Sequence, residues 1–345
     1  MSRGYHNYRG RKSGGKAALT VILVLIILVS VGFIFLQERI IFFDETGTAY
    51  FRLPGQTVEE ETPQEEIDLT IQNMEEEKPV TVWELRGFNT PVPLDREVWS
   101  LTARQARETL GEDCGAAAVT LKDSKGNVYF DSAAALPGTV QFMAEDTDVA
   151  LAAVLDSSYH TIARISCFHD PKAANREVET MGLMNTGGFI FYDGNNSQWL
   201  DPAKSAAREY VRAIACEAAA MGFDEILLTD LSYPTEGKLD KIAYGDVDRM
   251  ETLDAFLVEM RTALEPYSVR LSVEVPESVI LEGEDETAGL HMGKLSRRVD
   301  GIYAVTAPER AGLLNLTVSK SGDADFVAEL ETYTEGLTGS FLIFW

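Results

Sequence analysis

Two carboxylates in this 345-residue chain follow short apolar runs in the way that catalytic side chains follow strands. Asp230 comes two residues after the end of the run 225–228, and Glu274 lies near the end of the run 269–275. Glycoside hydrolysis uses two carboxyl groups, one as an acid and the other as a base or nucleophile. Asp230 and Glu274 are therefore the candidate catalytic pair.

Other polar and aromatic residues occupy similar positions and are candidates for binding a sugar. Aromatic rings offer flat apolar faces to sugar C–H bonds, and carboxylates accept hydrogen bonds from sugar hydroxyls. An acidic protein places some carboxylates at any loop rim, so a purely structural role is the competing interpretation. The candidates are Lys122, Asp123, Arg164, Asp170, Tyr192, Trp199, Asp201 and Tyr233.

No pattern of metal ligands occurs in the sequence, so neither a metal nor another cofactor is predicted. The four histidines are scattered, and there is no CxxC motif. The three cysteines are an odd number, which excludes a complete disulfide framework. Cys167 lies in an apolar run and Cys216 in a helical pattern, so both are predicted to be small buried hydrophobic residues.

From residue 80 to residue 345, short apolar runs alternate with helical patterns. Helices are predicted at 206–221 and 250–264, the first ending at Gly222 in a left-handed cap. The alternation indicates a parallel sheet, and seven or eight strands favour a (β/α)8 barrel with ligands at the carboxyl ends of the strands. The predicted strands are 82–87, 116–121, 161–166, 225–228, 269–275, 301–305, a weaker one at 313–318, and 341–345. The interval from 305 to 313 is too short for a crossover helix, which predicts an irregular barrel around strands 6 and 7.

The N-terminal part of the chain is predicted to anchor it in the cell membrane. Residues 17–36 carry no charge, and a helix of that length spans about 30 Å, the thickness of a bilayer core. Residues 1–16 carry five Arg and Lys and no acidic residue, so the positive-inside rule keeps them in the cytoplasm and places the main domain outside the cell. A cleaved signal peptide is the alternative, although it would have a shorter apolar core and a small-residue cleavage site.

An acidic segment separates the anchor from the domain, and the net charge of the chain restricts the choice of partner. Residues 37–79 are rich in Glu and predict an acidic, flexible linker, with a short strand at 49–53, and residues 80–345 form the globular domain. The net charge of −25 repels nucleic acid and anionic polymers. A neutral or cationic ligand is therefore favoured, and no nucleic acid is expected as a partner.

Four ordered motifs resemble those of a bacterial glycosyl hydrolase domain family of unknown function. They lie at 118–126, at 162–165 with 168–171, at 199–202 and at 222–234. The last is similar to the family signature G-F-D-E-I-Q-F-D-Y-V-R-F-P. The resemblance covers roughly residues 85–345 and implies a TIM barrel related to carbohydrate-active enzymes.

The chain departs from this family where the family carries carboxylates. Thr229 stands in place of the second Asp of the signature, and Thr120 in place of a common Asp on the second strand. A threonine hydroxyl cannot act as an acid or base near neutral pH. Asp230 lies one residue later, which on a strand turns its side chain to the opposite face unless a bulge or an early strand end intervenes. Glu274 matches an acidic position of the family.

The leading hypothesis is therefore a membrane-anchored, extracytoplasmic glycoside-hydrolase-like domain that binds a glycan of the cell wall, with weak or lost hydrolysis. It predicts that the carboxyl of Asp230 points toward the helical layer or solvent and away from Glu274. An active hydrolase that uses this pair is one alternative. A scaffold for other envelope proteins is another, and large exposed apolar patches would favour it.

Overall fold

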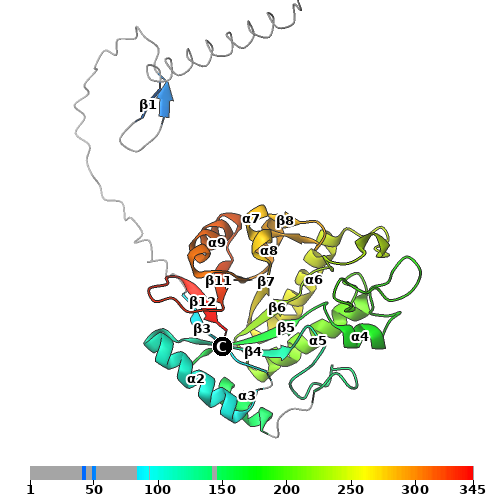
Figure 1. The fold of residues 1–345 in the computed structure, drawn as a ribbon, viewed down its shortest axis with the longest axis horizontal. Helices are drawn as coiled ribbons and strands as arrows, with labels where there is room; N and C mark the ends of the chain where they lie inside the picture. The colour runs from blue at the N-terminus through cyan, green and yellow to red at the C-terminus, as the bar shows by residue number, and fades with distance from the viewer. Residues whose placement is uncertain (1–40, 44–48, 52–83, 93, 142–145, 345) are drawn as a thin grey trace, which may run out of the picture. The chain divides into compact units, whose positions relative to one another are not determined.

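The structure is a computed structural model that describes residues 41–43, 49–51, 84–92, 94–141 and 146–344 (Figure 1). The chain divides into two compact units, Met1–Lys78 and Pro79–Trp345. In the first unit, β1 (Ile41–Phe43) pairs antiparallel with β2 (Ala49–Phe51), which confirms the short strand predicted there. The predicted tail, anchor and nearly all of the rest of the linker lie outside the described residues. Of the helices that are described, none is long and apolar enough to span a bilayer.

In the second unit, eight parallel strands close into a barrel, which confirms the predicted (β/α)8 architecture. Each strand pairs with the next along the chain, and the last pairs with the first. The strands are β3 (Arg86–Asn89), β4 (Ala116–Lys122), β5 (His160–Ser166), β6 (Glu225–Thr229), β7 (Arg270–Glu274), β10 (Gly301–Val305), β11 (Asp325–Leu330) and β12 (Ser340–Ile343). A short antiparallel pair, β8 (Glu284–Asp285) with β9 (Leu290–His291), lies between β7 and β10.

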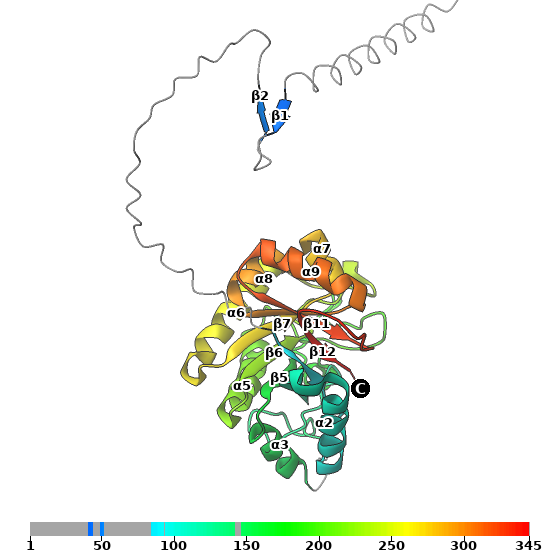
Figure 2. The same ribbon diagram turned by 90° about the vertical axis from the view of Figure 1, so that its left-hand side faces the viewer.

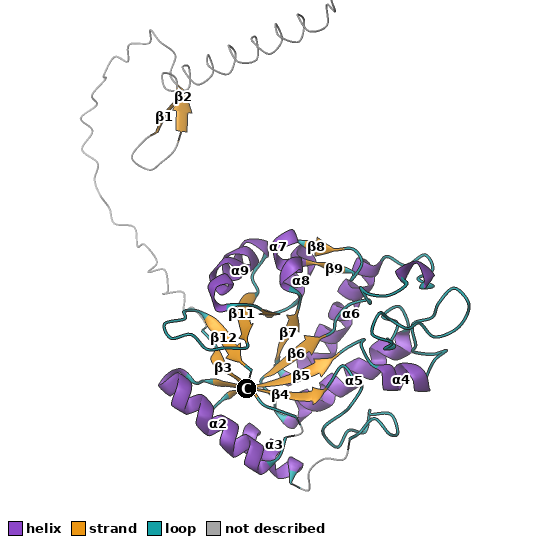
Figure 3. Ribbon diagram, viewed as in Figure 1, coloured by secondary structure: helices purple, strands orange, loops and turns teal. Residues whose placement is uncertain are grey.

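The helices lie on the outside of the barrel (Figure 3), with α2 and α3 on the opposite side from α7, α8 and α9 (Figure 2). They are α2 (Arg96–Leu110), α3 (Thr147–Leu155), α4 (Pro171–Arg176), α5 (Ser205–Met221), α6 (Arg249–Leu264), α7 (Glu277–Glu282), α8 (Met292–Arg298) and α9 (Pro308–Ser321). Short 3-10 turns are η1 (Gly111–Asp113), η2 (Leu239–Lys241) and η3 (Glu265–Tyr267). Helices α5 and α6 confirm the two predicted ones, and Gly222 caps α5 at φ 105° as expected.

The predictions of a strand at 313–318 and of an irregular barrel are wrong. These residues lie within α9, which begins with Pro308 in its first turn and buries side chains at helical spacing. The buried side chains of α9 are Ala311, Leu314 and Val318. The seventh strand follows as β11, so the connection from β10 contains a complete crossover helix and the barrel is regular there.

Side chains alternate along each strand between the barrel interior and the layer between strands and helices. A small apolar cluster fills the middle of the barrel, and a larger one lies beneath the helices. The interior cluster consists of Leu85, Ala116, Ala118, Ile162, Leu227, Tyr303, Val327 and Leu342. Polar and charged side chains extend from the strands above and below this cluster.

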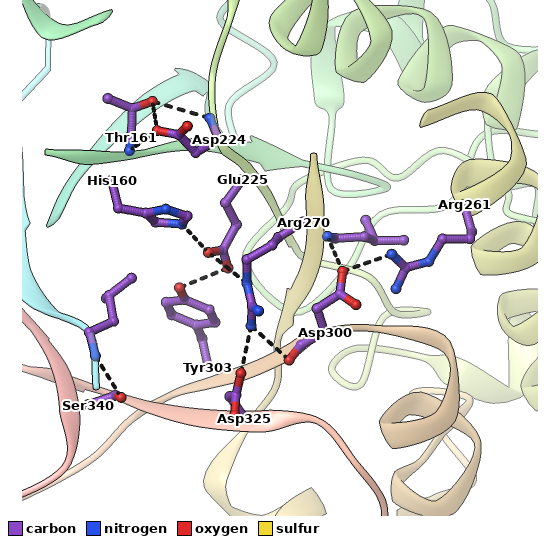
Figure 4. Close-up of polar contacts among 12 residues, drawn as sticks. His160, Thr161, Asp224, Glu225, Arg261, Arg270, Asp300, Tyr303, Asp325 and Ser340 are labelled. Atoms are coloured by element: carbon purple, nitrogen blue, oxygen red, sulfur yellow. Dashed lines mark hydrogen bonds and ion pairs between the residues drawn. The ribbon is translucent and has the colours of Figure 1, made fainter. Parts of the chain in front are cut away.

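At the amino ends of the strands, a buried polar network closes the barrel (Figure 4). Glu225 is fully buried, accepts a hydrogen bond of 2.9 Å from the Tyr303 hydroxyl, and lies 2.8 Å from Nε2 of His160. Arg270 donates to Asp325 at 2.8 Å. Burial, together with the neighbouring Glu225 carboxylate, raises the pKa of Tyr303 well above its ordinary value. This end of a TIM barrel serves stability, so the functional site is sought at the other end.

Candidate functional site

The strand β6 ends at Thr229, and the chain turns sharply at the next residue. Asp230 adopts φ +50°, one of only three non-glycine residues with positive φ among those described. Aspartate tolerates this left-handed conformation better than most residues. The turn brings the Asp230 carboxylate onto Ser166, on the interior face of β5, whose hydroxyl donates to it at 2.7 Å. Asp230 therefore returns to the barrel mouth, and the expectation that it faces the helical layer or open solvent is not met.

Asp230 and Glu274 line one cavity of about 260 Å³ at the carboxyl ends of the strands. They are its only charged lining residues in the described part of the chain. The remaining walls are mostly apolar and consist of Leu231, Ser232, Val275, Pro276, Leu290 and Val305. The structure thus brings the two predicted carboxylates to a single site.

Arg164 projects from β5 into the barrel between two carboxylates. Its guanidinium forms ion pairs with Glu274 of β7 and Glu329 of β11, and it lies 5.5 Å from the ring of Phe344. Burial disfavours the charged guanidinium, but the two carboxylates outweigh this and raise the pKa of Arg164. Of the predicted binding residues, Arg164 is the one that contacts the candidate pair.

Glu329 is a part of this site that the sequence interpretation missed. Its side chain is fully buried, and burial raises its pKa from 4.5 to about 8, against the opposing effect of Arg164 and with a further upward effect of Glu274. Its Oε2 has no hydrogen-bond partner among the described atoms, and neither has the side-chain amide of Asn89 at the end of β3. The sequence pattern does not identify 325–330 as a strand, so it does not place Glu329 near the end of one.

Lys122 and Asp170 form a buried ion pair of 2.9 Å instead of lining the cavity. The register between β4 and β5 shifts between Thr120 and Lys122, so Lys122 turns outward, and its ammonium lies 5.9 Å from the ring of Tyr210 on α5. The Lys122 ammonium also donates to the carbonyl of Ser166 at 2.8 Å. The pair thus supports the strand end that carries Ser166.

Trp199 and Tyr233 are also buried, so they do not form an aromatic rim. The Trp199 indole is 9% exposed, stacks on His169 with ring centroids 4.4 Å apart, and donates to Asp193 at 2.8 Å. Tyr233 is 1% exposed. Of the three aromatic residues predicted to bind a sugar, only Tyr192, at 46%, is exposed to solvent.

The last two predicted residues, Asp123 and Asp201, accept hydrogen bonds from residues close to them in the sequence. Asp123 accepts hydrogen bonds from the backbone of Asn127 and from the hydroxyl of Tyr129. Asp201 accepts one from the backbone of Ala203, and burial raises its pKa. Within the described ranges, no three His, Cys, Asp or Glu side chains are grouped closely enough to hold a metal ion.

Comparisons with known proteins agree with this architecture. Residues 109–316 match the family model described as "Putative glycosyl hydrolase domain". The structure is similar to the PgaB (BpsB) glycoside hydrolase domain from Bordetella bronchiseptica (12% identity, 72% of this chain and 84% of that chain, TM-score 0.50). It is also similar to a β-galactosidase from Marinomonas ef1 (10%, 76% and 54%, 0.50) and to a hypothetical protein from Ruminiclostridium thermocellum (26%, 51% and 90%, 0.43).

No curated protein sequence matches the chain. The solved glycoside hydrolases are too distant in sequence to show more than a shared fold. The family model, in contrast, matches more than half of the chain and includes the strands that carry Arg164, Asp230 and Glu274. The protein therefore belongs to this glycosyl hydrolase domain family and carries a glycosyl hydrolase-like barrel.

Proposed function

We propose that the protein binds a neutral glycan of the cell wall in the cavity at the barrel mouth, and that hydrolysis there is weak or lost. The domain acts outside the cell, held at the membrane by residues 17–36. This placement rests on the apolar run and its basic flank in the sequence.

The observation that carries the proposal is the pairing of two carboxylates with apolar walls in one cavity. The carboxylates of Asp230 and Glu274 accept hydrogen bonds from hydroxyls, and the apolar walls suit the C–H faces of a sugar ring. The cavity, at about 260 Å³, is smaller than the ~300–1,000 Å³ typical of pockets for drug-sized ligands. A single sugar ring suits that volume.

Weak hydrolysis follows from the partners of the two carboxylates. Glu274 is paired with the Arg164 guanidinium, and Asp230 accepts a hydrogen bond from the Ser166 hydroxyl, so each carboxylate already has a partner within the protein. Glycoside hydrolysis needs one carboxyl to deliver a proton to the leaving group. Glu329, whose pKa burial raises to about 8, is fully buried and does not line the cavity.

Hydrolysis by Asp230 and Glu274 remains the second candidate function, because the turn at Asp230 places both carboxylates at one cavity. In that case one of the two carboxyl groups would have to carry the proton that is delivered to the leaving group, and the other would act as base or nucleophile. The functional readout that separates the two candidates is release of new reducing ends.

The binding proposal is tested by sedimentation of the full-length protein with purified, insoluble cell-wall polysaccharide. We expect wild-type protein to bind, and Glu274→Gln to bind at least tenfold more weakly, because the substitution removes a charged acceptor and its ion pair. Tyr267→Ala serves as a control, since Tyr267 lies in η3 at the amino end of β7, away from the cavity. Equal binding by wild type and Glu274→Gln would show that the polysaccharide binds elsewhere.

A further inference from the structure

A second hollow, here called the loop groove, lies between the loop after β5 and the loop after β6. Its volume is about 460 Å³. It is lined by Asn185, Ile190, Phe191, Tyr192, Asp193, Gly194, Gly237, Lys238 and Lys241. The two most exposed aromatic side chains among the described residues belong to the loop after β5. Tyr192, which is 46% exposed, lines the groove. Phe189, which is 73% exposed, directly precedes the lining residue Ile190.

Backbone pairing makes the loop groove a preformed feature. Asn185 pairs with Ile242 across the two loops, and the backbone N–H of Thr186 donates to the carbonyl of Lys241 at 2.8 Å. At Gly237, with φ +99°, a Cβ atom would lie 2.9 Å from the backbone nitrogen of Gly194. Only glycine allows the two loops to approach this closely.

The turn that carries Phe189 also has a fixed backbone. The side chain of Asn185 accepts hydrogen bonds from the backbone N–H groups of Gly187 and Phe189, at 2.9 Å and 3.2 Å. Gly188 adopts φ +80°, and its N–H donates to the carbonyl of Asn185 at 3.0 Å, which closes the turn. An exposed ring on an ordered turn indicates a contact surface.

The loop groove and the cavity at the barrel mouth share one chain segment. The segment after β6 begins with Asp230, Leu231 and Ser232 in the wall of the cavity. It continues to Gly237, Lys238 and Lys241 in the wall of the loop groove. The segment 230–241 therefore contributes lining residues to both hollows.

We infer that the loop groove is a second sugar-binding subsite, and that the ligand is an oligosaccharide or polymer of neutral sugars, not a single sugar. This inference rests on the proposed function of the mouth. Tyr192 and Phe189 would stack on sugar faces, while the Lys238 ammonium would donate hydrogen bonds to hydroxyls. Lys241 is paired with Asp240 at 2.8 Å, so the groove has no strong surplus of positive charge that would select an anionic chain.

The test measures how affinity depends on ligand length. Full-length protein, in a detergent without a sugar head group, is titrated with fluorescent β-1,4-linked oligomers of glucose and of N-acetylglucosamine, with two and with six sugars. We expect at least one hexamer to bind more tightly than its dimer. Tyr192→Ala and Phe189→Ala should weaken hexamer binding about three- to tenfold and leave dimer binding unchanged.

Tyr267→Ala is the matched control, because this ring is also exposed, at 39%, but lies at the other end of the strands. Melting temperatures of all variants establish that they fold. Equal affinity for both lengths, or hexamer binding by Tyr192→Ala as tight as by Tyr267→Ala, would overturn the inference.

The variant Glu274→Gln separates failure of the loop groove from failure of the mouth. If only this variant weakens binding, and does so for both lengths, the mouth is a sugar site and the loop groove is not. If only the ring variants weaken binding, sugars bind at the loop groove without the mouth. No binding of either length by wild type would overturn both.

Discussion

Arg164 determines the charge balance at the barrel mouth, because one guanidinium serves two carboxylates. The Arg164 guanidinium forms ion pairs with both Glu274 and Glu329. A lysine at this position would lack the rigid, planar fork with which arginine directs separate N–H groups at two carboxylates. The mouth is therefore arranged to hold Glu274 in place, which suits binding better than proton transfer.

The buried Glu329 gives a prediction for the pH dependence of stability. Its pKa is 4.5 in the reference state and about 8 in the folded protein, so between these values the folded state binds more protons than the unfolded state. The free energy of unfolding should then fall as pH rises from about 5 to 8, by about 1.4 kcal/mol per pH unit at most. Glu329→Gln mimics the protonated carboxyl and should flatten this part of the curve. Urea denaturation at several pH values measures it, and an unchanged slope in the variant would contradict the assignment.

Residue types and positions alone selected the candidate pair and Arg164, but not their orientation. Asp230 faces the mouth because its own φ angle, just after β6, is positive. In this conformation its carboxylate accepts a hydrogen bond from the Ser166 hydroxyl. Similarly, Trp199 follows a loop pattern typical of an exposed ring, yet it stacks on His169 and is buried. Such contacts join residues distant in the sequence, so local patterns do not contain them.

At the scale of elements, strands and helices with one clear period were predictable. Helices α5 and α6 and strands β4 to β7 lie close to their predicted ranges. The error at 313–318 arose because this apolar stretch in α9 resembles a short strand when it is read alone. Burial at 311, 314 and 318 has the helical period, and recognising it would have exposed β11 and Glu329 together.

The end of β6 offers a test of how an element positions the site. Asp230→Val should destabilise the protein by about 1–2 kcal/mol, because a β-branched side chain is strained at φ +50°. Asp230→Asn should leave stability nearly unchanged, since Asn also tolerates this conformation. Chemical denaturation of both variants measures the difference. Equal stability of the two variants would mean that Asp230 does not adopt the left-handed turn in solution.

At the scale of the whole molecule, the predicted anchor and acidic linker would hold the barrel at the cell surface. Protease added to intact cells should cut within the predicted linker, near residues 59–77, and release a soluble domain. An antibody against the barrel detects the released fragment in the medium. Appearance of the same fragment without protease would instead support cleavage of a signal peptide.

The central claim is that the barrel mouth binds a glycan without efficient hydrolysis. One experiment measures both: full-length protein is incubated with purified cell-wall polysaccharide, and the bound fraction and new reducing ends are determined for wild type and Glu274→Gln. We predict binding by wild type, binding at least tenfold weaker in Glu274→Gln, and no reducing ends above the blank in either. Reducing ends that wild type produces and Glu274→Gln does not would contradict the account and establish Glu274 as part of an active hydrolase.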